Sequence, residues 1–333
     1  MGEKTYYPWI DWAKLIGIYL VIMGHGWLLD ERWKIFIYSF HMPFFFLVSG
    51  LLFKYRPLPK LLKNDWHRLI VPYLLMNLYF LLRSLVGPIL HGTLTAEYLF
   101  SRLGAIVLGI GYSTHGFIPV CDTCWFIMAL FIMHILVTVC HTGKQWINWL
   151  VIAACIAAAF LLQTLNINVL TSVNSSLLAV PFFYLGICMN PLLDCIGSRK
   201  YVVVKGVAGA GLLVLTWFLS ALNGRVDVDL CKWGDNLFVF YALALIGSAG
   251  IILVGSIFNR AVFFVKTISK GTIFILGFNL YFIDISKRLV SLIPNYHHGN
   301  ALGFVWGGVI LLVSFLLILL LQRYFPVILG NRK

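Results

Sequence analysis

Long apolar runs recur along the whole chain and are separated by short polar segments. A helix needs roughly 20 apolar residues to cross a bilayer, because it rises about 1.5 Å per residue. The pattern therefore predicts an all-α polytopic membrane protein with about ten transmembrane helices. The predicted spans lie near 12–29, 35–53, 68–86, 125–141, 147–166, 175–193, 203–222, 236–257, 271–292 and 301–325.

A weaker apolar run at 97–111 differs from these spans. It carries Glu97 and Arg102, and a charged group inside a bilayer is costly. We therefore predict an interfacial or re-entrant helix there. The chain shows no internal repeat and no low-complexity tract, so we interpret residues 1–333 as a single membrane domain.

Composition and charge agree with this class. The chain is 61% hydrophobic and 11% charged, whereas soluble domains have about 45–50% apolar and 25% charged residues. The net charge of +13 comes from Lys and Arg in short connections, which favours lipid contact and topology signals over nucleic acid. These basic residues concentrate in alternate connections, which predicts that both termini are cytoplasmic in a bacterial inner membrane. The oligomeric state cannot be predicted.

The first predicted span carries three ionisable residues, Asp11, Lys14 and His25. Lys14 and His25 are eleven residues apart, so they lie roughly 16 Å apart on nearly the same helix face. Asp11 precedes Lys14 by three residues and is near enough to pair with it. Ionisable groups at membrane depth indicate a functional site. The alternative is that Asp11 and Lys14 anchor the helix at the interface while His25 makes a structural hydrogen bond.

The second predicted span places His41 and Pro43 close in depth to His25, because the two spans are antiparallel. Two imidazoles at one depth can share general-base and orienting roles. They can also satisfy each other's hydrogen bonds in a purely structural role. Ser49 and Gly50 are small, and residues of that size let helix backbones approach closely.

The segment from Lys54 to Arg68 is strongly basic and falls in a predicted cytoplasmic connection. Clustered cations of this kind suit a polyphosphate ligand. The alternative is that the charges only fix the topology of the chain.

The spacing of the cysteines does not identify a disulfide. Cys121, Cys124 and Cys231 fall in predicted outer loops, and three thiols leave one unpaired in any scheme. The sequence does not choose among the pairings. No set of Cys, His and carboxylate residues has zinc-like spacing, so we expect no metal.

Several motifs together resemble the acyltransferase-3 family of integral membrane acyltransferases. They are Asp-x-x-Lys-x10-His at 11–25, Phe-His-Met-Pro-Phe-Phe-Phe-x-x-Ser-Gly at 40–50, Arg-Leu-x-x-Pro-Tyr at 68–73 and Trp-Phe-Ile-Met-Ala-Leu-Phe at 125–131. Further matches lie at 181–186 and 268–278. The tracts at 223–229 and 241–248 are similar to the branch related to fucose O-acetylases.

The resemblance implies a ten-helix enzyme that moves an acyl group, most often acetyl, from cytoplasmic acyl-CoA to a carbohydrate hydroxyl. The acceptor would be a sugar or glycolipid of the cell envelope or an exported glycan. The implied catalytic residues are His25, Lys14, Asp11 and His41, and the implied donor-binding residues are Lys63, Arg68, Ser49 and Trp125.

Three positions depart from the family pattern. Lys14 lacks the bidentate guanidinium of Arg. Asp65 occupies the first place of an Arg-x-x-Arg pattern that ends at Arg68, and Asn279 stands where relatives often have His. The identity of the CoA ligands and a second histidine from the ninth span are therefore in doubt.

The chemistry requires a base for the sugar hydroxyl and stabilisation of the tetrahedral oxyanion. We expect His25 to abstract the proton, or to carry the acyl group as an acyl-imidazole, while His41 orients it or stabilises the oxyanion. The rival interpretation is a transporter or flippase for a glycan or small metabolite, which would show paired broken helices. The outer loops hold candidate acceptor contacts, or simply solvated charge, at Asp122, Arg225, Asp227, Asp229 and Trp233.

Overall fold

Helices account for all the regular structure in the part of the chain that the computed structural model describes, residues 6–169, 172–292 and 299–330. In chain order they are α1 (Pro8–His25), α2 (Glu31–Tyr38), α3 (His41–Leu51), α4 (Leu58–Asp65), the π-helix η1 (Trp66–Ile70), α5 (Val71–Leu90), α6 (Ala96–Val107), the 3-10 turn η2 (Asp122–Cys124), α7 (Trp125–Val139), α8 (Gln145–Thr164), α9 (Val173–Met189), η3 (Asn190–Leu192), α10 (Leu193–Gly197), α11 (Val202–Asn223), α12 (Leu237–Ile257), α13 (Phe263–Lys270), α14 (Thr272–Val290), α15 (Asn300–Tyr324) and η4 (Pro326–Leu329).

The all-α polytopic membrane architecture is confirmed. Within the described ranges, eight helical stretches are long and apolar enough to cross a bilayer. Two of the ten predicted spans, those at 12–29 and 271–292, correspond to α1 and α14, which carry charged residues and do not reach that apolarity. α1 packs against α2, α3 and α12 to α15. A helix enclosed in this way presents little surface to lipid, so it tolerates polar side chains better than a peripheral one.

The second predicted span is divided into α2 and α3. Pro43 lies in the first turn of α3 and has no N–H, so the helical hydrogen bonds cannot continue through it. The Nδ1 atom of His41 instead bonds the carbonyl oxygen of Ile37 across the break, at 2.9 Å. The break therefore fixes the position of His41.

α3 and α9 pack backbone to backbone. A Cβ atom added at Gly50 would lie 1.9 Å from the carbonyl oxygen of Phe183, and one added at Gly186 would lie 2.1 Å from that of Leu47. Only glycine fits at either position. The close approach predicted from the small residues of the second span is therefore confirmed at Gly50.

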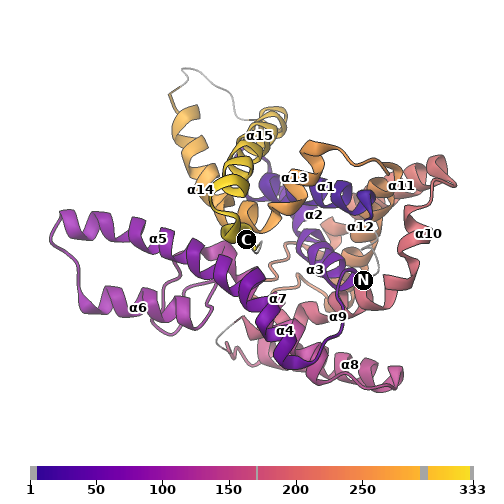
Figure 1. Cartoon of the computed structure of the whole chain (residues 1–333), viewed down its shortest axis with the longest axis horizontal. Helices are drawn as coiled ribbons and strands as arrows, with labels where there is room; N and C mark the ends of the chain where they lie inside the picture. Colours follow the sequence, from indigo (N-terminus) through magenta and orange to yellow (C-terminus); the bar gives the residue numbers. More distant parts are fainter. Residues whose placement is uncertain (1–5, 170–171, 293–298, 331–333) are drawn as a thin grey trace.

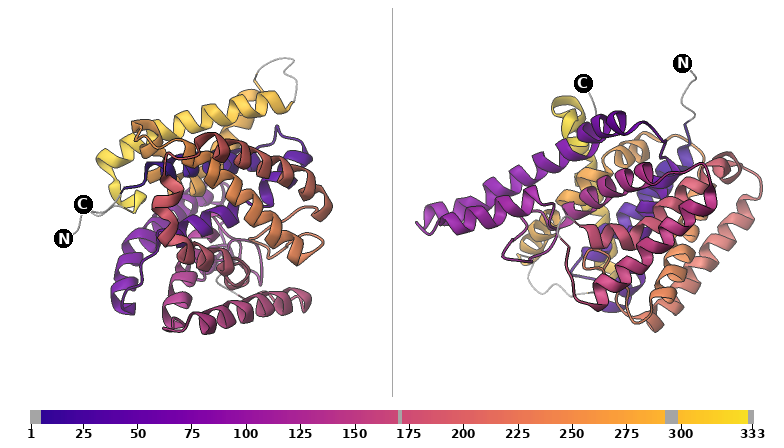
Figure 2. Two further views of the ribbon diagram at one scale, coloured as in Figure 1. Left: turned by 90° about the vertical axis from the view of Figure 1, so that its right-hand side faces the viewer. Right: turned by 90° about the horizontal axis from the view of Figure 1, so that it is seen from below.

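The predicted weak run at 97–111 forms α6, which folds back along α5. Tyr73 and Tyr98 donate hydroxyl hydrogen bonds to the carbonyl oxygens of Ile106 and Ser84, both at 2.8 Å. The α5–α6 hairpin projects from the main bundle at the left of Figure 1, and α8 lies along the lower edge, against α9 (Figure 2, left).

α1 and α15 run antiparallel, because Gly303 lies beside Leu29 and Gly307 beside Met23. The start of α1 and the end of α15 therefore share one end of the bundle. We call this the inner end and the opposite one, where α1 finishes, the outer end. At the inner end Ser269 donates to Asp11 at 2.5 Å, and at the outer end Arg225 pairs with Glu31 at 2.9 Å.

Candidate active site

A cavity opens at the outer end of the bundle and holds both histidines predicted from the first two spans. We call it the outer cavity. Its volume is about 120 Å³. Its lining comes from α1, α2, α3, η2, α7, α14 and the loop between α11 and α12, and consists of Val21, His25, Tyr38, His41, Met42, Asp122, Thr123, Trp125, Asp227, Val228, Asp229, Leu276 and Leu280.

The hydrogen bonds of the two histidines settle which nitrogen carries the proton. The Nδ1 atom of His25 lies 3.0 Å from the carbonyl oxygen of Val21, four residues earlier in α1. The Nδ1 atom of His41 makes the same contact with Ile37. A carbonyl oxygen only accepts, so each Nδ1 must donate. In the neutral rings the Nε2 lone pairs are left available as bases.

The two imidazoles lie close together, as predicted from their equal depth. Their ring centroids are 6.2 Å apart and the planes are nearly perpendicular. Tyr38 lies beside both rings, 5.6 Å from His25 and 4.8 Å from His41 between centroids. Neither Nδ1 bonds the other ring, so the interpretation in which the two histidines satisfy each other's hydrogen bonds is wrong.

Asn279 reaches the same backbone atom as His25. Its side chain is completely buried, and Nδ2 lies 3.4 Å from the carbonyl oxygen of Val21. Asn279 thus contacts the group that fixes the His25 tautomer. α14 therefore contacts the backbone beside His25 through an amide side chain and not through a second imidazole.

Carboxylates line the outer side of the same cavity. Asp227 lies near enough to His25 for their charges to interact. Burial raises the pKa of Asp227. It also raises the pKa of Asp229 well above its ordinary value, and the charges of Asp227 and Asp122 add to that rise. The loop that holds Asp227 and Asp229 is therefore not simply solvated.

A disulfide braces another part of the lining. Cys121 and Cys124 are bonded across η2, and Thr123 between them donates to the carbonyl oxygen of Gly277 at 3.2 Å. This pairing leaves Cys231 free and buried. Burial raises the pKa of its thiol to about 12, so it stays protonated and unreactive.

A second cavity opens toward the inner end, and we call it the inner cavity. Its volume is about 360 Å³, and its lining includes three cationic side chains, Lys54, Arg56 and Arg68. The π-helix η1 carries Arg68, and π-helical turns are frequent at functional sites. Ser49 also lines this cavity.

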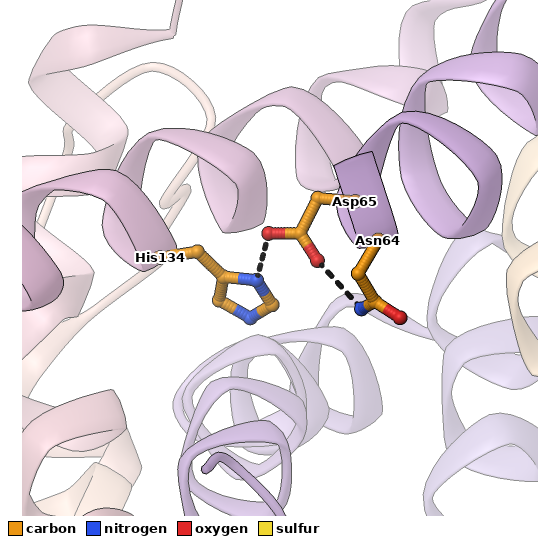
Figure 3. A network of polar contacts seen from close by, with 3 residues as sticks. All are labelled: Asn64, Asp65 and His134. Carbon is orange, nitrogen blue, oxygen red and sulfur yellow. Dashed lines mark hydrogen bonds and ion pairs between the residues drawn. The ribbon is translucent and has the colours of Figure 1, made fainter. Parts of the chain in front are cut away.

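A buried histidine–carboxylate pair faces the inner cavity (Figure 3). The Nδ1 atom of His134 lies 2.8 Å from Oδ2 of Asp65, and the two side chains are 14% and 2% exposed. Asn64 donates to the other oxygen of Asp65 at 3.2 Å. The carboxylate holds Nδ1 as the donor and leaves Nε2 of His134 for the cavity.

Three helices line both cavities. α3 contributes Met42 to the outer cavity and Ser49 to the inner one, and α7 contributes Trp125 and Leu130 in the same way. α14 contributes residues to both as well. At about 1.5 Å per residue the two linings are only ~5–10 Å apart along these helices. The buried rings of Phe46 and Phe126, with centroids 4.6 Å apart, lie at the intervening positions.

The predicted site residues do not all lie in one cavity. His25, His41 and Trp125 meet in the outer cavity, whereas Ser49 and Arg68 line the inner one. The remaining three line neither cavity: Asp11, Lys14 and Lys63. Within the described ranges no cluster of three or more His, Cys, Asp and Glu side chains is arranged to hold a metal ion.

Asp11 and Lys14 form no ion pair in the part of the chain that the structure describes, although their charges interact, as the three-residue spacing predicts. The two ion pairs among the described residues are His134–Asp65 and Arg225–Glu31. Asp11 accepts hydrogen bonds from Tyr6 and Ser269 instead, both at 2.5 Å. The bond from Ser269 ties the start of α1 to α13.

Sequence reasoning missed the Asp65–His134 pair. His134 is a titratable residue inside an otherwise apolar span, and that signal could have marked it as a candidate. Its partner lies 69 positions away in the chain. The sequence alone gives no sign that α4 and α7 are neighbours.

Comparisons with known proteins point in one direction. A family described as an acyltransferase domain matches residues 7–323. The chain is 32% identical over 247 residues to nodulation protein NolL from Mesorhizobium japonicum. The match covers 71% of this chain and 59% of NolL, so the chain spans less than two thirds of that protein. No solved structure matches.

Proposed function

The chain belongs to the acyltransferase family whose domain it matches over residues 7–323, and from this membership we propose that it moves an acetyl group from cytoplasmic acetyl-CoA to a carbohydrate hydroxyl. The protein is a multi-pass membrane acyltransferase. The proposed acceptor is a sugar of an envelope or exported glycan, and the proposed location is a bacterial inner membrane.

The arrangement of the two cavities carries the proposal. A cationic cavity at the inner end suits the phosphates of CoA, because Lys54, Arg56 and Arg68 offer charge-assisted hydrogen bonds. The outer cavity offers two imidazoles with accessible Nε2 atoms. Both cavities share α3, α7 and α14. A donor entering from the inner end and an acceptor entering from the outer end would therefore meet between them.

His25 is the proposed general base. Its Nε2 takes the proton of the acceptor hydroxyl while the hydroxyl oxygen attacks the thioester carbonyl. The carbon–oxygen bond forms, the carbon–sulfur bond breaks, and the imidazolium returns its proton to the departing thiolate. His41, 6.2 Å away between ring centroids, accepts at Nε2 in its neutral form and is placed to orient the hydroxyl; it stabilises the oxyanion only as the imidazolium, in which both nitrogens donate. Lys14 lines neither cavity, so its proposed role is to support the inner half of α1.

The test is transfer of radiolabelled acetyl from acetyl-CoA to a cell-envelope glycan extract by detergent-purified protein. His25→Ala is compared with wild type, and His91→Ala, an exposed histidine in the α5–α6 connection, is the matched control. We expect transfer by wild type and His91→Ala, and a loss of about 100-fold or more in His25→Ala. Full activity in a folded His25→Ala protein would overturn the assignment of the base.

A further inference from the structure

Three carboxylates line the outer cavity. Asp122 comes from η2, and Asp227 and Asp229 come from the loop between α11 and α12. Segments about 100 residues apart in sequence thus direct three carboxylates into one space. The charges of Asp122 and Asp227 both oppose the ionisation of Asp229.

The described lining of the outer cavity contains neither Lys nor Arg. Two arginines outside this lining interact electrostatically with the carboxylates, Arg102 with Asp122 and Arg225 with Asp227. The Arg225 guanidinium pairs with Glu31 at 2.9 Å and lies over the ring of Tyr38 at 5.1 Å. Arg225 is therefore engaged at the rim of the cavity.

A separate feature of this space is a histidine that can bond a ligand. His41 is 98% buried, being only 2% exposed, yet it lines the outer cavity. Its Nδ1 is held by Ile37, and no hydrogen bond from the described residues reaches its Nε2. Nε2 is therefore the ring nitrogen that can bond a molecule in the cavity or water.

We infer that the acceptor ring entering the outer cavity is an uncharged sugar, and that Asp122, Asp227 and Asp229 exclude rings that bear a carboxylate, sulfate or phosphate. This inference rests on the proposed function. Sugar hydroxyls donate hydrogen bonds, and carboxylates are acceptors with several lone pairs each. A ring that carries its own acidic group would bring a further negative charge beside these carboxylates. Such like-charge contacts oppose binding in a partly desolvated site.

The same three aspartates would select an acceptor without touching the donor. The basic residues that suit CoA phosphates all lie in the inner cavity. Opposite charge in the two cavities keeps an anionic donor at the inner end and an uncharged acceptor at the outer end. Specificity for the acceptor is therefore separable from donor binding.

The experiment uses the full-length purified protein, radiolabelled acetyl-CoA and oligosaccharide fragments of envelope polysaccharides whose repeat contains both a neutral hexose and a uronate. Each fragment offers the two rings at equal concentration, and mass spectrometry locates the acetyl group. We expect wild type to label neutral rings at least about tenfold more than uronate rings, because of the charge repulsion. Asp229→Asn and Asp227→Asn should lower that preference. Asp194→Asn, an exposed carboxylate on α10, is the matched control and should retain it.

Labelling of uronate rings at the rate of neutral rings by wild type would overturn the inference while leaving the proposed function intact. An unchanged preference in both cavity variants would also overturn it, because the aspartates would then not be the source. A folded protein that labels neither ring in any fragment contradicts the proposed carbohydrate acylation, and the inference is lost with it.

Discussion

At the scale of single residues, the structure assigns the protons of the two outer histidines through backbone contacts rather than through carboxylates. His25 and His41 each donate from Nδ1 to a carbonyl oxygen four residues earlier. The helices themselves therefore set the tautomer, and the Nε2 atoms are directed to the same cavity. His134 is different, because a buried carboxylate holds it.

Substitutions at Arg68 and Lys63 test whether the inner cavity binds the acyl donor. Both are exposed cations of the basic segment, but only Arg68 lines the inner cavity. We expect Arg68→Ala to raise the KM for acetyl-CoA about tenfold, since a hydrogen bond to a charged group contributes roughly 1.5–3 kcal/mol. Lys63→Ala should leave it within about twofold. Equal effects of the two substitutions in steady-state kinetics would contradict the placement of the donor.

Asp229 provides a prediction about pH. Burial and two neighbouring aspartates raise its pKa in the folded protein, so the folded state binds the proton more tightly than the unfolded chain. The stability that this proton contributes is present below the unfolded pKa and is lost as the pH rises through the folded pKa. Asp229→Asn removes the buried charge. We expect the variant to be more heat-stable than wild type at pH 8.

Thermal unfolding in detergent at pH 8 and at progressively lower pH measures this difference. The advantage of Asp229→Asn over wild type should shrink as the pH falls and wild-type Asp229 takes up its proton. An advantage that grows toward low pH would have the wrong sign. Asp194→Asn, on the exposed side of α10, should follow wild type throughout.

At the scale of helices, the position of the site depends on a break, a bulge and a close contact. The break between α2 and α3 sets His41, the π-helix η1 presents Arg68, and the contact of Gly50 with α9 holds α3 in place. α3 lines both cavities. The α3–α9 contact therefore supports the whole site rather than one end of it.

Replacement of Gly50 tests this contact. A Cβ atom there would lie 1.9 Å from the carbonyl oxygen of Phe183, which is backbone and cannot move aside alone. Gly50→Ala should destabilise the protein by about 1–3 kcal/mol, the usual cost of overpacking. The control is Gly211→Ala, in α11, where no atom lies within 4 Å of the added Cβ. Equal melting temperatures for the two variants would show that α3 and α9 are not so close.

The sequence predicts most of these helices because their apolar runs have the length of a bilayer crossing. It also predicts that His25 and His41 are neighbours, since antiparallel spans bring equal depths together. It does not predict the break at His41, which depends on how Pro43 ends the hydrogen bonding of α2. Nor does it predict the roles of Asp65 or Asp229. Charge in a connecting segment is usually solvated, and only the packing of distant helices encloses these two side chains.

At the scale of the whole molecule, the two cavities lie on the same helices but have opposite charge and open toward opposite ends. Both described termini lie at the inner end, where the basic segment from Lys54 to Arg68 also lies. The predicted cytoplasmic location of the termini would place the donor cavity in the cytoplasm and the outer cavity across the membrane. Transfer would then be vectorial.

Transfer across sealed proteoliposomes tests this arrangement most directly. Radiolabelled acetyl-CoA, which does not cross lipid, is added outside, and the glycan acceptor is either trapped inside or added outside. Randomly oriented protein suffices, because the comparison depends only on the sides of the two substrates. We predict acetylated glycan when the acceptor is trapped inside, and none above the His25→Ala background when both substrates are outside. Product formed only with both substrates on one side would contradict a donor and an acceptor that enter from opposite ends.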